Sequence, residues 1–124
     1  MDVVNIDRVT PYITKDGSEI RELLSHRNSV IRNQSLAEAR LAPGGSTTLH
    51  HHPRTEEIYF ILTGAGRMRV GDDIRDIAAG DAIAIPSGAP HQLTNTSDVS
   101  MRLLCCCSPA YEHDDTVLMG GEER

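Results

Sequence analysis

Three adjacent histidines and two adjacent carboxylates stand close together in the segment 50–57. The histidines are His50, His51 and His52, and the carboxylates are Glu56 and Glu57. Imidazole and carboxylate are side chains that divalent transition metals take from proteins. These types and this spacing indicate half of a metal site, and the surrounding elements must supply the rest.

Strand alternation sorts these residues into two faces. If residues 47–52 form a strand, His50 and His52 point together and His51 points the opposite way. An antiparallel strand that begins at Glu57 would bring its carboxylate level with the histidine pair. His91, which follows a rigid Pro-x-Gly-x-Pro loop, is the candidate for a third imidazole.

Three imidazoles and one carboxylate that converge inside a fold can bind a divalent ion. A six-coordinate Mn, Fe, Ni or Co ion would keep positions open for water, dioxygen or a chelating substrate. A tetrahedral Zn ion could be closed by the same four ligands. The residue types therefore do not determine which metal is bound.

The rest of the chain must position these side chains, and from residue 36 onward its pattern is β. Short runs rich in β-branched and aromatic residues alternate with turns that contain Gly, Pro or Asp, and no long helical pattern interrupts them. The expected strands are 36–42, 47–52, 57–62, 67–70, 74–77, 82–85, 91–95 and 99–107. Before them, residues 3–13 can add an edge strand, and 20–24 can be a strand or a helical turn. This pattern predicts an all-β sandwich or barrel.

The bulk composition narrows the partners and the compartment. A net charge of −6 argues against nucleic acid and against an anionic membrane as partner. The chain shows neither a secretory signal pattern nor an apolar run of membrane-spanning length, so we expect a cytoplasmic protein. Cys105, Cys106 and Cys107 are adjacent and cannot form a normal disulfide, which fits a reducing compartment. We expect them to be small buried side chains, with a thiolate role still open.

Two spaced motifs in the centre of the chain resemble those of the cupin superfamily. The first is Gly44, five residues, His50-x-His52, four residues, Glu57, six residues and Gly64; the second is Gly80, five residues, Pro86-x-Gly88, two residues, His91, three residues and Asn95. The resemblance implies a double-stranded β-helix, or jelly-roll barrel, and usually a homodimer. It also implies a divalent ion (Mn, Fe, Ni, Co or Zn) held by His50, His52, Glu57 and His91. The family spacing also admits Glu56 as the carboxylate, and the six residues that separate Glu57 from Gly64 favour Glu57.

We divide the chain into three parts. Residues 1–35 are expected to pack on the barrel as an N-terminal segment, 36–110 to form the barrel, and 111–124 to form a C-terminal tail. Both faces of 57–62 are apolar, although a strand of a small barrel should have one wet face. A second subunit, or the N-terminal segment, is therefore expected to cover this strand.

Alternation also predicts what lines the barrel around the metal ligands. The expected lining residues are Ala37, Ala39, Leu41, Tyr59, Ile61, Met68, Val70, Ile83, Ile85, Leu93, Asn95 and one face of 101–107. This lining offers Tyr59 and Asn95 as polar groups and no cation for a phosphorylated sugar.

The lining favours a small oxygen-bearing molecule chelated at the metal. We therefore expect a metal-dependent, oxygenase-like enzyme in which Tyr59 is the acid or base. Two alternatives stay open: an isomerase or lyase acting on a sugar derivative, and a non-catalytic cupin that binds a small ligand.

Overall fold

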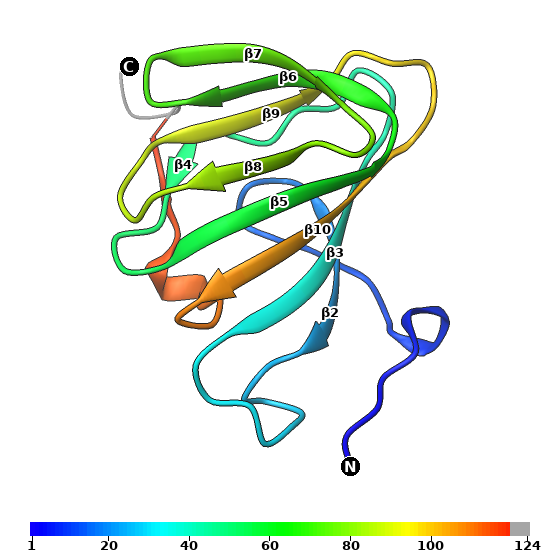
Figure 1. Ribbon diagram of the computed structural model, residues 1–124, viewed down its shortest axis with the longest axis vertical. Helices are drawn as coiled ribbons and strands as arrows, with labels where there is room; N and C mark the ends of the chain where they lie inside the picture. Colours follow the sequence, from blue (N-terminus) through cyan, green and yellow to red (C-terminus); the bar gives the residue numbers. More distant parts are fainter. Residues whose placement is uncertain (120–124) are drawn as a thin grey trace.

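Two antiparallel sheets form the body of the molecule, as the computed structural model shows (Figure 1). The structure describes residues 1–119. The strands are β1 (Tyr12–Ile13), β2 (Glu19–Leu24), β3 (Ser35–Leu41), β4 (His50–His51), β5 (Glu56–Thr63), β6 (Ala65–Val70), β7 (Asp73–Ala78), β8 (Ala82–Ile85), β9 (His91–Asn95), β10 (Met101–Ser108) and β11 (Val117–Leu118). Two short 3-10 helices accompany them, η1 (Ile6–Arg8) and η2 (His113–Asp115).

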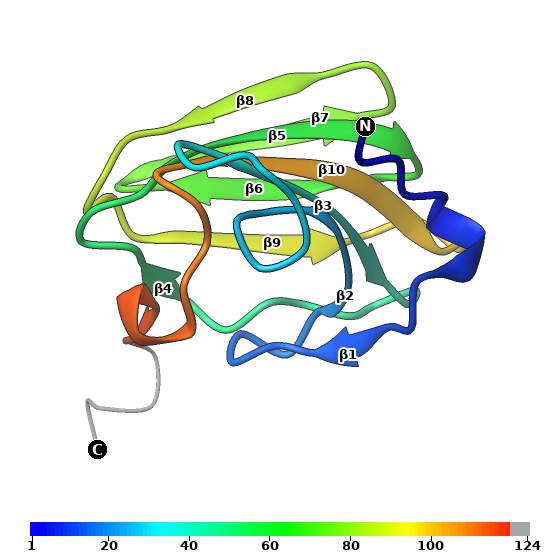
Figure 2. The ribbon, with the colours of Figure 1, turned by 90° about the horizontal axis from the view of Figure 1, so that it is seen from below.

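The strand order is that of a jelly-roll barrel, so the predicted fold class is confirmed. One sheet has the order β1-β2-β3-β10-β5-β8 and the other the order β11-β4-β9-β6-β7. Figure 1 shows β8, β5, β10 and β3 running side by side in the first sheet. In Figure 2, seen from below, the hairpin β1–β2 lies beside β3, so the N-terminal segment extends the first sheet.

Alternation along β5 and β10 builds the core between the sheets. Glu57, Tyr59 and Ile61 point inward and are buried, whereas Ile58 and Phe60 point outward with 51% and 39% of their surface exposed. The inward face of β10 is buried in the same way. The predicted lining residues that are buried in this core are Ala39, Leu41, Tyr59, Ile61, Met68, Ile85 and Leu93, with Val70 and Ile83 packed against them. The period-two prediction of the core is therefore confirmed.

Gly64 makes the tight turn between β5 and β6 possible. Its φ is +91°, a conformation that is strained for residues with a Cβ, and an added Cβ would also press on Met101. The sharp reversal lets β6 pair with β9 immediately after β5 has paired with β10. The chain therefore passes from the first sheet to the second within the single residue Gly64.

One predicted strand is much shorter in the structure. Residues 47–52 were expected to form a strand, but only His50 and His51 do so. The reason lies in the backbone before them. The N–H of Thr48 donates to the carbonyl of Asp16 at 2.8 Å, so the backbone at this residue bonds to the turn between β1 and β2 and not to a strand. The segment 20–24, which could have been a strand or a helical turn, belongs to strand β2.

The described part of the C-terminal tail packs on the barrel. β11 pairs with β4, with Val117 opposite His51 and Leu118 opposite His50. Asp115 in η2 is only 4% exposed. The part of the expected tail beyond residue 119 lies outside the described residues. Within residues 1–119, no helix has the length and apolar character needed to cross a membrane.

Candidate metal centre

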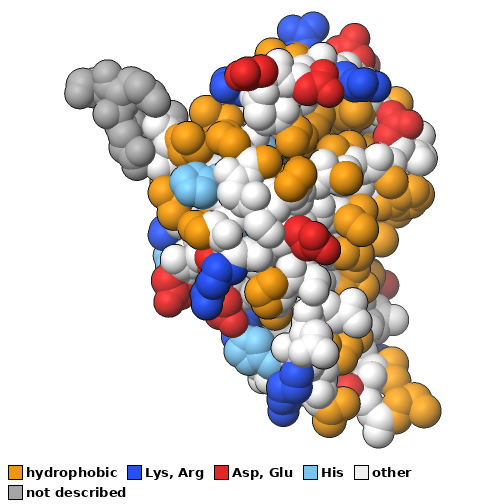
Figure 3. Space-filling model, turned by 60° about the vertical axis from the view of Figure 1, so that its left-hand side comes forward, with side chains coloured by type: hydrophobic (Ala, Val, Ile, Leu, Met, Phe, Trp, Pro, Cys, Tyr) orange, Lys and Arg blue, Asp and Glu red, His pale blue; other side chains and the backbone are white. Residues whose placement is uncertain are grey.

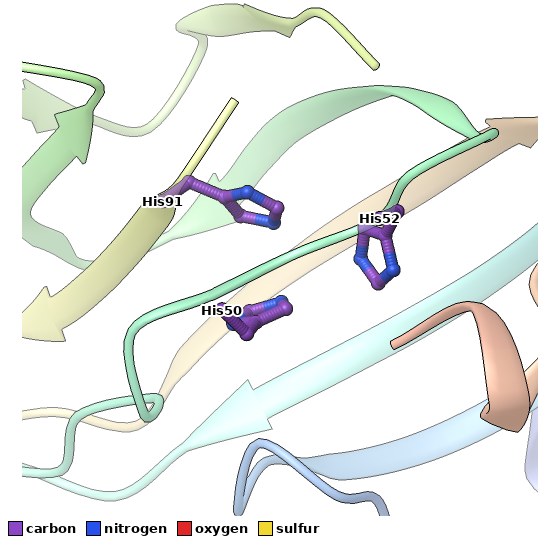
Figure 4. A group of neighbouring side chains, drawn as sticks. All are labelled: His50, His52 and His91. Atoms are coloured by element: carbon purple, nitrogen blue, oxygen red, sulfur yellow. The ribbon is translucent and has the colours of Figure 1, made fainter. Parts of the chain in front are cut away.

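Three histidines from two neighbouring segments meet inside the barrel (Figure 4). His50 on β4 lies directly opposite His91 on β9, and their ring centroids are 4.2 Å apart. His52 follows the end of β4, and its ring centroid lies 5.1 Å from that of His50 and 5.3 Å from that of His91. All three are buried, and one nitrogen of each lies within 4.8 Å of the others. The three histidines are thus positioned to hold a metal.

The hydrogen bonds of the three rings determine which nitrogens face the centre. In every ring Nδ1 contacts a backbone carbonyl oxygen, which only accepts hydrogen bonds, so Nδ1 carries the proton. The neutral ring then has its lone pair on Nε2. The contacts are His50 Nδ1 to Thr48 O at 2.7 Å, His52 Nδ1 to Asp115 O at 3.2 Å, and His91 Nδ1 to Ala89 O at 3.0 Å.

Glu57 brings a carboxylate to this triad from the opposite sheet. Its Oε1 lies 3.4 Å from Nε2 of His52 and 3.6 Å from Nε2 of His91. Its Oε2 accepts a hydrogen bond from Sγ of Cys107, which faces it on β10, at 3.4 Å. Glu56 is exposed on the other face of β5. Glu57 is therefore the member of the glutamate pair beside the triad.

The electrostatics of the cluster follow from burial and from mutual contact. Burial, and then the neighbouring His91, lower the pKa of His50 to about 4. Burial also disfavours the charged form of His52, but the adjacent carboxylate of Glu57 outweighs this effect and raises the pKa of His52. Burial alone would raise the pKa of Glu57, yet His52 and His91 bring it down to about 2. Glu57 is thus a carboxylate that needs a cationic partner.

Polar atoms without partners show that the cluster fits a cation. Among the described residues, Glu57 Oε1 and His91 Nε2 are buried and have no hydrogen-bond partner. Buried polar atoms are rarely left in this state, because their desolvation is not compensated. Nitrogen and oxygen acceptors that converge in a buried site match the donor set of Mn, Fe, Ni, Co and Zn.

A small pocket adjoins the triad. Its volume is about 50 Å³, and both His50 and His52 line it. The carboxylates of Asp16, Glu22 and Glu57 line it, and among residues 1–119 no lysine or arginine does. Its apolar wall includes Ala37, Ala39, Leu41, Tyr59, Leu93, Leu103 and Cys105.

Tyr59 and Asn95 were both expected to be polar members of the lining, and only Tyr59 is. Tyr59 lines the pocket, and its ring centroid lies 6.0 Å from that of His91. Burial, and then the charge of Glu57, raise the pKa of Tyr59 well above 10, so its hydroxyl keeps its proton.

Asn95 is instead fully buried outside the pocket, where its side chain joins two backbone segments. Its Nδ2 donates to the carbonyl oxygens of Leu41 and Val99. The expectation that Asn95 lines the pocket was therefore wrong, because the backbone carbonyls of Leu41 at the end of β3 and of Val99 before β10 engage its amide group.

Two further carboxylates were not found from the sequence. Asp16, in the turn between β1 and β2, has its Oδ2 3.4 Å from Nε2 of His50. Asp115 accepts hydrogen bonds from the backbone N–H groups of Arg54 and Thr55, and its own carbonyl contacts His52. Both lie far from the motifs in sequence, and no local spacing pattern connects them to the histidines.

Comparison with known proteins gives this chain close and distant relatives. It is 45% identical to an uncharacterized protein of Methanocaldococcus jannaschii over 113 residues, which cover 91% of this chain and 90% of the relative. It is 34% identical to an oxalate-binding protein of Thermotoga maritima over 69% of this chain and 71% of the relative.

Solved structures share the fold along nearly the whole chain. The crystal structure of a predicted oxalate decarboxylase from Thermotoga maritima matches with a TM-score of 0.74 and 29% identity, over 95% of this chain and all of the other. The polyketide cyclase RemF from Streptomyces resistomycificus matches in fold with a TM-score of 0.80 at 23% identity, over 96% and 85% of the two chains. The model of the cupin domain matches residues 37–107, which include both histidine segments and the strand that carries Glu57. The chain therefore belongs to the cupin family.

Proposed function

We propose that this protein is a metal-dependent enzyme that acts on a small, uncharged, oxygen-bearing molecule. The metal is divalent, and its ligands are His50, His52, Glu57 and His91. The observation that carries this proposal is the convergence of three Nε2 lone pairs, each set by an Nδ1 contact to a backbone carbonyl. Glu57 joins them because one of its oxygens is held by Cys107 and the other is buried beside the triad.

The chain's own groups define the chemistry at this site. A bound divalent metal supplies Lewis acidity, and if it is iron it can also activate dioxygen. Tyr59 donates a hydrogen bond to a ligand in the pocket, because its raised pKa keeps the hydroxyl protonated. The apolar walls hold the carbon part of the ligand and exclude bulk water.

The charge of the pocket limits the ligand. Asp16 and Glu22 add carboxylates to the pocket beyond Glu57, and no basic side chain of the described residues lines it. A dianion or a phosphorylated sugar would need cationic groups there. For this reason we do not extend the oxalate ligand of the Thermotoga maritima relative to this protein.

The metal assignment is tested by elemental analysis of the purified protein and of three variants. His50→Ala and His91→Ala each remove a proposed ligand and should abolish stoichiometric metal. His51→Ala is the matched control, because this neighbouring side chain points to the other face of β4 and should leave the metal content unchanged. Full metal content in the His50→Ala and His91→Ala proteins together would refute the site.

The catalytic part is tested by turnover and by oxygen uptake of the metal-reconstituted protein. The substrates are a panel of diketones, hydroxy acids, thiols and uronates. Tyr59→Phe should reduce turnover strongly and retain the metal, since only the hydroxyl is removed. Tight stoichiometric binding without turnover across the panel would instead identify a ligand-binding cupin.

We also propose that the protein is a homodimer that pairs through the outer face of the first sheet. Ile58 and Phe60 on β5 stand beside Ala84 and Ala82 on β8, and all four are exposed. Hydrophobic side chains gather down one side of the molecule in Figure 3. This uncharged strip is complementary to itself, which suits a two-fold contact with a second copy.

The oligomeric state is measured by light scattering coupled to size-exclusion chromatography. Ile58→Glu should give a monomer, because it places a charge in the proposed contact. Ile74→Glu is the control, since Ile74 is equally exposed but lies on β7 of the other sheet. A monomeric wild-type protein, or an Ile58→Glu dimer, would overturn the proposal.

A further inference from the structure

Asp16 is a carboxylate outside the cupin motifs that is aimed at the metal centre. It lies in the turn between β1 and β2, and its side chain is 13% exposed. Oδ1 is fully engaged within the turn, where it accepts from Oγ1 of Thr14 at 2.6 Å and from N and Oγ of Ser18 at 2.9 and 2.7 Å. Three donors therefore fix the carboxylate and leave Oδ2 free.

The free oxygen faces the one side of the triad that Glu57 does not reach. Asp16 Oδ2 lies 3.4 Å from Nε2 of His50, whereas Glu57 contacts Nε2 of His52 and of His91. Because Asp16 approaches a single histidine, it stands at the edge of the donor set and not at its centre. Asp16 also lines the pocket, together with Thr14 and Ser18 of its own turn. Its free oxygen is therefore next to the space that a ligand must enter to reach the metal.

A carboxylate in this position needs a proton donor. His50 Nε2 has a lone pair and no proton in the neutral ring, so it cannot donate to Asp16. A dianionic ligand would add a further negative charge close to Oδ2. A neutral ligand with an acidic hydroxyl would instead supply the missing hydrogen.

We propose that Asp16 accepts a hydrogen bond from a hydroxyl group when a neutral hydroxy-carbonyl ligand binds at the metal centre. The class includes enols of diketones, enediols and hydroxamic acids. The ligand's O–H donates to Oδ2 of Asp16, the oxygen that the turn leaves free, and no covalent bond changes. The ligand stays neutral and Asp16 stays a carboxylate, so no further negative charge enters the site. This inference rests on the proposed metal site, and it narrows the substrate class of that site.

Glu22 offers a matched comparison inside the same pocket. Its carboxylate also belongs to the lining, but Arg27 already neutralises it, with Nη2 of Arg27 2.6 Å from Oε1 and Nε 3.2 Å from both oxygens. Two carboxylates of one pocket thus differ in whether a cation engages them. Only Asp16 is left to interact with a ligand.

Ligand binding to the Co(II)-loaded protein tests the proposal through its visible spectrum, with no need for turnover. The probes are acetohydroxamic acid, a neutral hydroxyl donor, and oxalate, a dianion. Asp16→Asn keeps an oxygen for Thr14 and Ser18 and replaces the free carboxylate oxygen by an amide NH2 group, which cannot accept a hydrogen bond. This change should weaken the binding of acetohydroxamic acid by about tenfold or more, because a hydrogen bond to a charged group has that strength. It should strengthen the binding of oxalate, because it removes a negative charge beside the ligand. Glu22→Gln should change neither affinity by as much.

The outcomes separate this inference from the proposed metal site. Unchanged selectivity in Asp16→Asn would overturn the role of Asp16, while the metal content of the protein would still support the triad. Loss of metal in Asp16→Asn, as in His91→Ala, would also overturn it, because Asp16 would then be a ligand of the metal. Retention of metal by both the His50→Ala and His91→Ala proteins would refute the metal site itself.

Discussion

Replacing Asn95 should destabilise the fold without affecting the metal. Its Nδ2 donates to Leu41 O at 3.0 Å and to Val99 O at 2.8 Å, and its Oδ1 accepts from N and Oγ of Ser97 at 2.9 and 2.7 Å. One side chain therefore joins the end of β3 to the loop that leads into β10. Asn95→Ala removes all four hydrogen bonds from a fully buried position.

The cost follows from where these bonds lie. Each hydrogen bond is worth about 1 kcal/mol net. In Asn95→Ala, water can bond to the freed groups of Ser97 and Val99 near the surface, but it cannot reach the carbonyl of buried Leu41. We expect Asn95→Ala to lower the free energy of unfolding by about 3 kcal/mol, which corresponds to roughly 10 °C in melting temperature.

Urea denaturation of the metal-free protein, at one protein concentration, measures this change. Asn95→Asp should cost at least as much as Asn95→Ala at pH 7, because it turns a charged oxygen toward two carbonyl oxygens. Ser97→Ala removes one of the four bonds and should cost about 1 kcal/mol. An Asn95→Asp protein as stable as the wild type would refute the donor role of Nδ2. Loss of metal by Asn95→Ala would mean that Asn95 belongs to the site after all.

Three other changes test the barrel and the groups around the centre. Gly66→Ala should destabilise by about 3 kcal/mol or more in urea denaturation, because the new Cβ would overlap a carbonyl oxygen of neighbouring β9. Asp115→Asn should cost about 1–2 kcal/mol at pH 7. Although burial raises its pKa, the N–H groups of the β4–β5 turn hold the pKa of Asp115 below its ordinary value; the difference from wild type should therefore be present above pH ~4 and fade as the pH falls through the lowered pKa. Cys107→Ala removes the thiol that donates to Glu57 and should weaken metal affinity by about tenfold in a chelator competition, whereas exposed Cys106→Ala should not.

The sequence predicted the barrel and the triad because both depend on short-range patterns. Period-two alternation placed Tyr59 and Ile61 inside and Ile58 outside, and the structure confirms each position. The histidine triad follows from the same logic together with the spacing of the two motifs. Alternation on β5 places Glu57 inside and Glu56 outside, in agreement with the preference for Glu57 that its spacing from Gly64 gave.

Contacts between distant segments were beyond this kind of prediction. Asp16 reaches His50 because a two-residue strand, β1, turns back along β2 and Thr48 bonds to the turn. Asp115 reaches the segment after β4 because β11 pairs with β4 from the far end of the chain. Asn95 misled the alternation argument, since a polar residue on the inward face can be engaged by backbone carbonyls and never meet the pocket.

Different elements supply the proposed metal ligands and the charged groups of the pocket, so each set of residues can vary without the other. The two sheets supply the triad and Glu57, and these residues lie within the part of the chain that matches the cupin domain. The hairpin β1–β2 lies outside that part and contributes Asp16 and Glu22 to the pocket. A relative with the same motifs but a different hairpin would therefore keep the same metal donors and meet ligands of a different charge. For this reason the barrel motifs of a small cupin indicate where a metal would be held, whereas the segment before the barrel carries information about the ligand.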